Sequence, residues 1–151
     1  MARVYKEVCN RFGLENVIVM GDSAGGGLCL ALCEYLSNKK VPLPKMAVLL
    51  SPWLDVDMTG EYPNEAEDPT LSICELTTYG ASYRRDLPVG HYLCSPLFGV
   101  VKPLPPLYVY VGEREMFLYD CMKLKQRCDQ LGVECNLKTY PEMPHVFVEY
   151  P

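Results

Sequence analysis

Positive charge is scarce in this sequence, and it is nowhere concentrated. Of the 151 residues, 14 are Lys or Arg and 19 are Asp or Glu, which gives a formal net charge of −5. No run of basic residues is longer than two. A nucleic-acid surface needs clustered positive charge, so this balance argues against a nucleic-acid partner.

Long uninterrupted apolar segments are also missing. The most apolar windows, near 17–36 and 46–54, are interrupted by Gly, Asp or Pro, and neither resembles the roughly 20 apolar residues of a membrane span. The first ten residues, MARVYKEVCN, contain no apolar signal-peptide core. We therefore predict no membrane span and a cytoplasmic location. The length corresponds to about one domain, which we place over 1–151.

Cysteine is abundant, but its spacing is not that of a bridge or metal site. The eight cysteines are at positions 9, 29, 33, 74, 94, 121, 128 and 135, with no C-x-x-C pair. This pattern predicts small buried apolar side chains in a reducing compartment. We expect no metal and no cofactor.

The apolar pattern alternates between two periods along the chain. Helical spacing predicts helices over 4–12, 24–36 and 117–131, and a possible capping box at Ser72 and Glu75 predicts a further helix that runs to about residue 83. Apolar runs and alternation predict strands at 17–20, 46–50, 107–111 and 133–139. Such alternation predicts an α/β fold, with a parallel sheet of about four strands in sequential order and helices on both faces.

Two of these segments carry further expectations. The run at 46–50 is continuously apolar, which is typical of a strand covered on both faces. Residues 55–104 are polar and rich in proline. We interpret them as a lid-like insertion within the single domain.

One strand, tight turn and helix are predicted in succession over 17–36, VIVMGDSAGGGLCLALCEYL. A Walker phosphate loop needs a lysine after its second glycine, and no lysine lies between Gly21 and Tyr35. A dinucleotide-binding turn needs G-x-G-x-x-G, which the glycines at 21, 25, 26 and 27 do not match. Both phosphate-binding interpretations therefore fail.

The same turn does match G-x-S-x-G, in Gly21-Asp22-Ser23-Ala24-Gly25. In that motif a serine sits on a strained strand-to-helix turn, so the residues two positions away on each side should lack side chains. The helix dipole behind the turn favours a developing oxyanion. We predict Ser23 as a nucleophile and the Ala24 N–H as an oxyanion donor.

The stretch GDSAGGGL resembles the nucleophile elbow of the hormone-sensitive-lipase-like branch of α/β hydrolases. Later segments resemble the same family in the same order, namely SPWLD at 51–55, DP at 68–69, SPL at 95–97, LPP at 104–106 and PEMPHVF at 141–147. The resemblance covers essentially the whole chain. It implies an α/β-hydrolase fold and hydrolysis of carboxylic esters by a Ser–Asp/Glu–His triad through an acyl-enzyme.

The resemblance also assigns a base and an acid. Of the two histidines, His145 lies in the turn where the family places its base, whereas His91 lies in the lid-like segment and is interpreted as a surface residue. Glu115 fits best as the acid. The alternatives are Glu113 and Asp120 after the same strand, and Asp55 after the preceding strand.

Part of the family pattern has no counterpart in this sequence. No His-Gly-Gly-Gly oxyanion segment occurs, and the chain resembles the C-terminal part of a hydrolase. Two hypotheses follow, an ester hydrolase or a catalytically deficient chain that acts as a binding or association module. An apolar sheet edge near Val17 predicts self-association. Tyr79, Tyr83, Tyr92 and Phe98 suggest an aromatic entrance suited to short or medium acyl esters or aryl esters.

Overall fold

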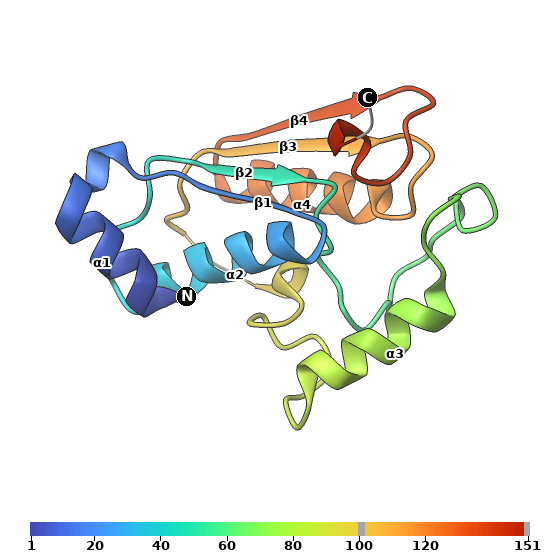
Figure 1. Ribbon diagram of the computed structural model, residues 1–151, viewed down its shortest axis with the longest axis horizontal. Coiled ribbons are helices and arrows are strands. Elements are labelled where there is room, and N and C mark those ends of the chain that lie inside the picture. Colours follow the sequence, from blue (N-terminus) through green and yellow to red (C-terminus); the bar gives the residue numbers. More distant parts are fainter. Residues whose placement is uncertain (100–101, 150–151) are drawn as a thin grey trace.

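The computed structural model of the protein describes residues 1–99 and 102–149. Its centre is a four-stranded sheet, formed by β1 (Val19–Asp22), β2 (Ala47–Leu50), β3 (Leu107–Gly112) and β4 (Cys135–Tyr140) (Figure 1). All neighbouring strands are parallel, and their spatial order β1-β2-β3-β4 equals their order in the sequence. The predicted fold class and strand order are confirmed.

Four helices and three short turns complete the described structure. The helices are α1 (Ala2–Phe12), α2 (Ala24–Asn38), α3 (Ile73–Arg84) and α4 (Leu118–Leu131). The 3₁₀ turns are η1 (Leu14–Asn16), η2 (Pro96–Phe98) and η3 (Phe147–Glu149). Within residues 1–99 and 102–149, no helix combines the length and the apolar character needed to cross a bilayer.

The helices that cover the sheet lie on one face of it. α2 packs on β1 and β2, and α4 packs on β3 and β4. Leu30 of α2, Leu124 of α4 and Leu49 of β2 belong to one apolar cluster, whereas the alternate residues Val48 and Leu50 are only half-buried. The expectation of helices on both faces, and of 46–50 covered on both sides, is therefore wrong for the described residues. An apolar run without alternation does not reveal which face is covered.

β1 forms one edge of the sheet, as predicted, and apolar side chains in β1 and just before it are exposed. Ile18 is 49% exposed and Met20 is 59% exposed, while Val17 is buried against α2. At the opposite edge, β4 alternates between buried Cys135 and exposed Asn136. The two edges differ in polarity, which bears on how the chain associates.

The long connection from β2 to β3 carries α3 and η2. Its first residues are buried, including Trp53, Asp55 and Val56. α3 itself lies apart from the sheet (Figure 1) and buries only Leu76 and Gly80. The connection therefore begins inside the molecule and only then reaches the surface.

The cysteines follow the prediction with two exceptions. All eight are free, and six of them are buried. Cys9 is half-buried and Cys74 is exposed on α3, so the prediction of a buried side chain is wrong for Cys74. α3 buries few of its residues, and the capping box that predicted this helix carries no information about burial.

Candidate active site

Ser23 occupies a strained turn between β1 and α2. Its backbone has φ of 48°, an unusual conformation for a residue other than glycine. The turn is held because the Ser23 N–H donates to the Leu50 carbonyl at 2.9 Å and the Ser23 carbonyl accepts from the Trp53 N–H at 2.9 Å. The Ser23 side chain thereby stands at the carboxyl edge of the sheet, ahead of the first turn of α2.

The glycines around Ser23 are required by close backbone contacts. A Cβ on Gly21 would lie 2.5 Å from the Gly25 carbonyl oxygen, and a Cβ on Gly27 would collide with the Trp53 carbonyl. At Gly25, in contrast, an added Cβ would meet no atom within 4 Å among the described residues outside its neighbours and the adjacent backbone of α2. The expected steric need for glycine on both sides of the serine holds for Gly21 and not for Gly25 in this structure.

His145 lies in the turn after β4, with one ring nitrogen toward Ser23. Its Nε2 is 2.9 Å from Ser23 Oγ, and its Nδ1 is 2.7 Å from Glu115 Oε2. Since Glu115 offers an acceptor and Ser23 a hydroxyl, these partners assign the proton to Nδ1 in the neutral ring. Phe117 packs edge-on against the imidazole at 5.1 Å between ring centres, which fixes the ring plane.

Glu115 is fully buried, and both of its oxygens are hydrogen-bonded. Oε2 faces His145, while Oε1 accepts from the Ser51 hydroxyl at 2.7 Å and from the Gly112 N–H at 2.6 Å. A buried carboxylate needs such donors to offset the loss of water. The structure thus aligns Ser23, His145 and Glu115 in one hydrogen-bonded chain.

The other carboxylates considered as the acid lie elsewhere. Exposed Glu113 accepts from the Thr139 hydroxyl at 2.7 Å, and buried Asp120 accepts from the Tyr62 hydroxyl at 2.9 Å. Burial raises the pKa of Asp120. Asp55 accepts from the Thr59 N–H and hydroxyl, each at 2.7 Å. In the described part of the chain, none of these three carboxylates is hydrogen-bonded to His145.

In the described residues, the second histidine makes no hydrogen bond to Ser23. His91 is half-buried, stacks on Tyr92 at 5.2 Å between ring centres, and accepts from the Leu93 N–H through Nδ1 at 3.3 Å. Its surroundings are those of a structural residue in the β2–β3 connection.

Sequence reasoning missed Ser51 and Phe117, which contact Glu115 and His145. The available signal for Ser51 was its position directly after β2, because the carboxyl ends of neighbouring parallel strands meet at one edge of the sheet. For Phe117 the helical spacing indicated only a buried core residue.

An apolar cavity of about 290 Å³ opens beside the first turn of α2, next to Ser23. Its lining includes Ala24 and Leu28 of α2, Trp53 after β2, and Tyr79 and Tyr83 of α3. Of the four aromatic residues expected at an entrance, only Tyr79 and Tyr83 line this cavity; Phe98 lines a different one, beside Lys123.

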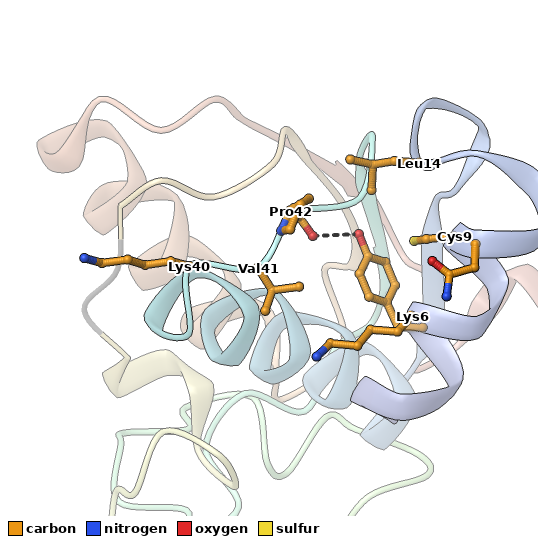
Figure 2. Close-up of a pocket in the computed structure, with 8 residues that line it drawn as sticks. Lys6, Cys9, Leu14, Lys40, Val41 and Pro42 are labelled. Carbon is orange, nitrogen blue, oxygen red and sulfur yellow. Dashed lines mark hydrogen bonds between the residues drawn. The ribbon is translucent and has the colours of Figure 1, made fainter.

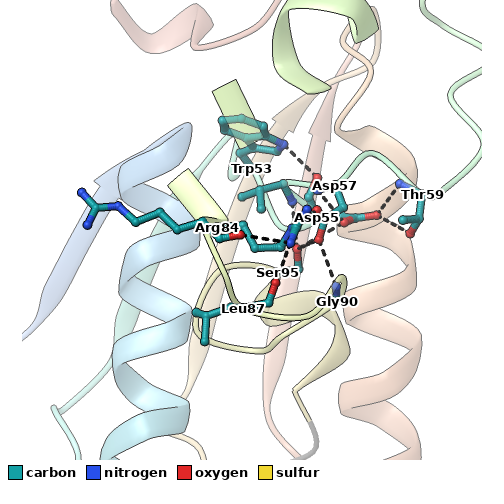
Figure 3. Close-up of polar contacts among 10 residues, drawn as sticks. Trp53, Asp55, Asp57, Thr59, Arg84, Leu87, Gly90 and Ser95 are labelled. Carbon is teal, nitrogen blue, oxygen red and sulfur yellow. Dashed lines mark hydrogen bonds and ion pairs between the residues drawn. The ribbon is translucent and has the colours of Figure 1, made fainter. Parts of the chain in front are cut away.

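A polar network holds α3 in place at this cavity (Figure 3). The Arg84 Nε pairs with Asp57 Oδ1 at 2.6 Å, and Asp57 Oδ2 accepts from the Gly90 N–H at 2.9 Å. The Ser95 hydroxyl accepts from the Val56 N–H at 3.0 Å. These contacts join the end of α3 to the segment after β2. The helix that carries Tyr79 and Tyr83 is therefore fixed by hydrogen bonds and an ion pair.

A larger cavity of about 470 Å³ lies at the other end of α2 (Figure 2). Lys6 and Cys9 of α1 face Lys40 and Pro42 across it, and the Tyr5 hydroxyl donates to the Pro42 carbonyl at 3.0 Å. With 15 residues, α2 is about 22 Å long, and this cavity is therefore far from Ser23.

No group of three or more His, Cys, Asp or Glu residues is placed to hold a metal ion within residues 1–99 and 102–149. The described site offers only a hydroxyl, an imidazole, a carboxylate, backbone amides and an apolar cavity.

Comparison with known proteins agrees with this fold. A family model described as "alpha/beta hydrolase fold" matches residues 2–149. An acetyl-hydrolase of Streptomyces hygroscopicus is 34% identical over 136 residues, which are 89% of this chain and 46% of the relative. A triacylglycerol lipase of Mycobacterium tuberculosis is 32% identical over 98% of this chain and 30% of its own length.

Solved structures give the same result. The crystal structure of an esterase from the bacterial hormone-sensitive lipase family superimposes with a TM-score of 0.90 and 35% identity, covering 95% of this chain and 49% of that one. The chain belongs to the α/β-hydrolase family. It spans about half the length, or less, of the relatives named above.

Proposed function

We propose that this chain carries the nucleophile, base and acid of a serine hydrolase that cleaves carboxylic esters. The observation that carries the proposal is the hydrogen-bonded series from Ser23 Oγ through His145 to Glu115. Its order along the chain, serine, acid and then histidine, is that of α/β hydrolases. The names of the relatives, acetyl-hydrolase and triacylglycerol lipase, agree with an ester as substrate.

The reaction would proceed in two halves. Ser23 Oγ attacks the ester carbonyl while His145 Nε2 takes the hydroxyl proton, and the collapsing intermediate expels the alcohol, which receives that proton. Water then attacks the acyl-enzyme, His145 takes its proton, and Ser23 is regenerated with release of the acid. Glu115 holds the Nδ1–H of His145 and stabilises the imidazolium formed in each half.

The negative charge of each tetrahedral intermediate needs hydrogen-bond donors. Ala24 is the first residue of α2, so no preceding helical turn accepts a hydrogen bond from its N–H. The positive end of the helix dipole lies at this same N-terminus and favours a nearby negative charge. We assign the Ala24 N–H as one oxyanion donor, as the sequence predicted.

The cavity beside Ser23 indicates the class of substrate. Its walls are mainly apolar and aromatic, from Leu28, Trp53, Tyr79 and Tyr83, and a cavity of about 290 Å³ is small. We propose esters with a short or medium acyl chain, or with an aryl group. The acyl-chain preference on p-nitrophenyl esters tests this directly, and a preference for long-chain esters would contradict it.

Labelling by a fluorophosphonate probe tests the nucleophile. We expect one covalent adduct on the 151-residue chain, located at Ser23 by mass spectrometry and lost in Ser23→Ala. Ser82→Ala is the matched control, since Ser82 is exposed on α3 and bonds only its own helix, through the Thr78 carbonyl. Labelling that survives Ser23→Ala would refute the assignment.

A second candidate function is a binding or association module with little catalysis of its own. The observation that favours it is the exposed edge at β1, with Ile18 and Met20 uncovered. Loss of an oxyanion donor typically costs about 10²–10³ in rate, and the sequence contains no His-Gly-Gly-Gly segment. Turnover of p-nitrophenyl butyrate by the 151-residue chain at the rate of an ordinary esterase would rule this candidate out.

A further inference from the structure

We propose that Ser51 is a positioning residue that holds the acid and the base of the site in register. The inference rests on the proposed function, because it concerns how the His145–Glu115 pair is kept in a productive geometry. Neither the G-x-S-x-G motif nor the assignment of Ser23, Glu115 and His145 requires this residue.

The Ser51 hydroxyl lies between the two segments that supply the acid and the base. It donates to Glu115 Oε1 at 2.7 Å and accepts from the Val146 N–H at 3.1 Å. Val146 directly follows His145, so one oxygen atom joins the carboxylate to the turn that carries the imidazole. The residue is 1% exposed, and these bonds are therefore shielded from bulk water.

The backbone around this hydroxyl is strained on both sides. Ser51 has φ of 44° and Val146 has φ of 52°. Positive φ is rare for residues other than glycine and a clear outlier for a β-branched residue such as valine. Strained residues persist where surrounding contacts fix them, and they cluster at active sites. The Ser51–Val146 hydrogen bond is such a contact.

The donors on Glu115 explain why this position affects chemistry. Oε1 is held by two of them, the Ser51 hydroxyl and the Gly112 N–H, and this fixes the carboxylate plane with Oε2 toward His145. Without the hydroxyl, only one donor remains on Oε1, and the carboxylate can rotate about its last bond. The imidazole then loses its fixed orientation toward Ser23.

Two substitutions separate the hydroxyl from the backbone strain. Ser51→Ala removes the hydroxyl and keeps a Cβ at positive φ, whereas Ser51→Gly removes the hydroxyl and relieves the strain. Ser95→Ala is the matched control for the His145 resonance alone, because Ser95 is a fully buried serine whose hydroxyl bonds Val56, Asp55 and Asp57 and is not hydrogen-bonded to Glu115 or His145.

Two readouts are measured on the 151-residue chain and its variants. The first is the downfield proton NMR resonance of the His145 Nδ1–H, which reports its bond to Glu115 without any turnover. The second is the rate of fluorophosphonate labelling at Ser23. We expect both Ser51 variants to lose or broaden the resonance and to label about 10- to 100-fold more slowly, the scale of a lost hydrogen bond to a charged group. Ser95→Ala should retain the resonance.

The outcomes distinguish this inference from the proposed function. An unchanged resonance in Ser51→Ala and Ser51→Gly, or its absence from the unsubstituted chain, overturns the positioning role. A defect in Ser51→Ala that Ser51→Gly lacks also overturns it, since strain would then be the cause. If the unsubstituted chain shows the resonance, the Ser51 variants lose it, and Ser23 is not labelled at all, the positioning role stands and the proposed hydrolase function fails.

Discussion

Three residues with left-handed backbone angles meet around one imidazole. Ser23, Ser51 and Val146 all have positive φ, and each is tied by a hydrogen bond to a neighbouring segment. Such conformations cost free energy that the surrounding fold must supply. At the scale of single residues, the strain is concentrated where Ser23, Glu115 and His145 meet.

The charge of Glu115 should matter more than its shape. Glu115→Gln keeps the volume of the side chain, but an amide no longer stabilises the Nδ1–H tautomer of His145 or the imidazolium. We expect fluorophosphonate labelling of Ser23 to slow by roughly 10⁴-fold, the scale known for acid-to-amide changes in serine triads. Rate constants from gel-based labelling check this. Glu113→Gln, at an exposed carboxylate, should keep the rate, and slow labelling in that variant instead would reassign the acid.

Another buried carboxyl, that of Glu34, should make the stability of the fold depend on pH. Glu34 is 2% exposed, and burial raises its pKa to about 9, with nearby Arg127 acting in the opposite direction. Between the usual carboxyl pKa and about 9, the folded state binds a proton that the unfolded state releases. The contribution of Glu34 to the free energy of unfolding is therefore most favourable at acidic pH and falls as pH rises toward 9.

Substitution of Glu34 should remove that slope. In Glu34→Gln, we expect the free energy of unfolding to decline less between pH 5 and pH 9 than in the unsubstituted chain. Urea denaturation at several pH values measures it, with the exposed Glu7→Gln as control. Equal pH slopes in Glu34→Gln and the unsubstituted chain would show that Glu34 is ionised in the folded state.

At the scale of elements, the β2–β3 connection braces the segment that carries Glu115. Asp68 Oδ2 accepts from the Met116 N–H at 3.0 Å, and the Asn64 side-chain amide donates to the Glu113 carbonyl at 2.8 Å. The two residues bound in this way, Glu113 and Met116, lie on either side of Glu115 in the sequence. The connection therefore supports the site from outside as well as lining its cavity.

Removal of this brace should destabilise the fold. We expect Asp68→Ala to lower the free energy of unfolding by about 1–3 kcal/mol, because Asp68 is a charged acceptor for several backbone N–H groups. Urea denaturation gives this value, and faster hydrogen exchange at the Met116 amide localises the loss. Glu67→Ala changes an exposed neighbour and should have little effect. A stable Asp68→Ala with unchanged exchange would contradict the brace.

The sequence predicted the positions of the helices and strands well, but it predicted less well which of their faces are covered and which residues meet at the site. Period and length placed four strands and four helices within a few residues of their observed bounds, because each apolar face has its own repeat. The motif and the family resemblance predicted Ser23, His145 and Glu115 as site residues. Ser51 was not predicted as part of the site, since its role depends on the meeting of two strand ends that are distant in sequence. The prediction that helices cover both faces of the sheet was wrong for a similar reason. The apolar run in β2 does not indicate which other elements pack on each of its faces.

At the scale of the whole molecule, the two sheet edges have opposite character. β4 carries polar Asn136 and Lys138, whereas Met20 of β1 and Ile18, just before β1, are exposed. The Val19 N–H is bonded to the Met46 carbonyl of the β2 side, so the N–H of Met20 points to the open edge. Unpaired apolar edges promote pairing with another strand.

We predict that the 151-residue chain self-associates through β1 and that Met20→Lys reduces this association. A charged residue on an edge strand opposes edge-to-edge pairing. Light scattering over a range of concentrations should show a lower average mass for the variant. Met122→Lys is the control, since Met122 is similarly exposed, at 51%, but lies on α4. Equal masses for Met20→Lys and the unsubstituted chain would exclude the β1 edge as the contact.

The hydrogen bond between Ser23 and His145 joins residues 122 positions apart. Closing so large a loop costs entropy and is slow compared with forming the helices beside it. The Ser23 hydroxyl, our proposed nucleophile, should therefore meet His145 only at the end of refolding, after β1 to β4 have come together. The rate at which a fluorophosphonate begins to label Ser23 during refolding would then measure the last stage of folding, in which the four strands come together.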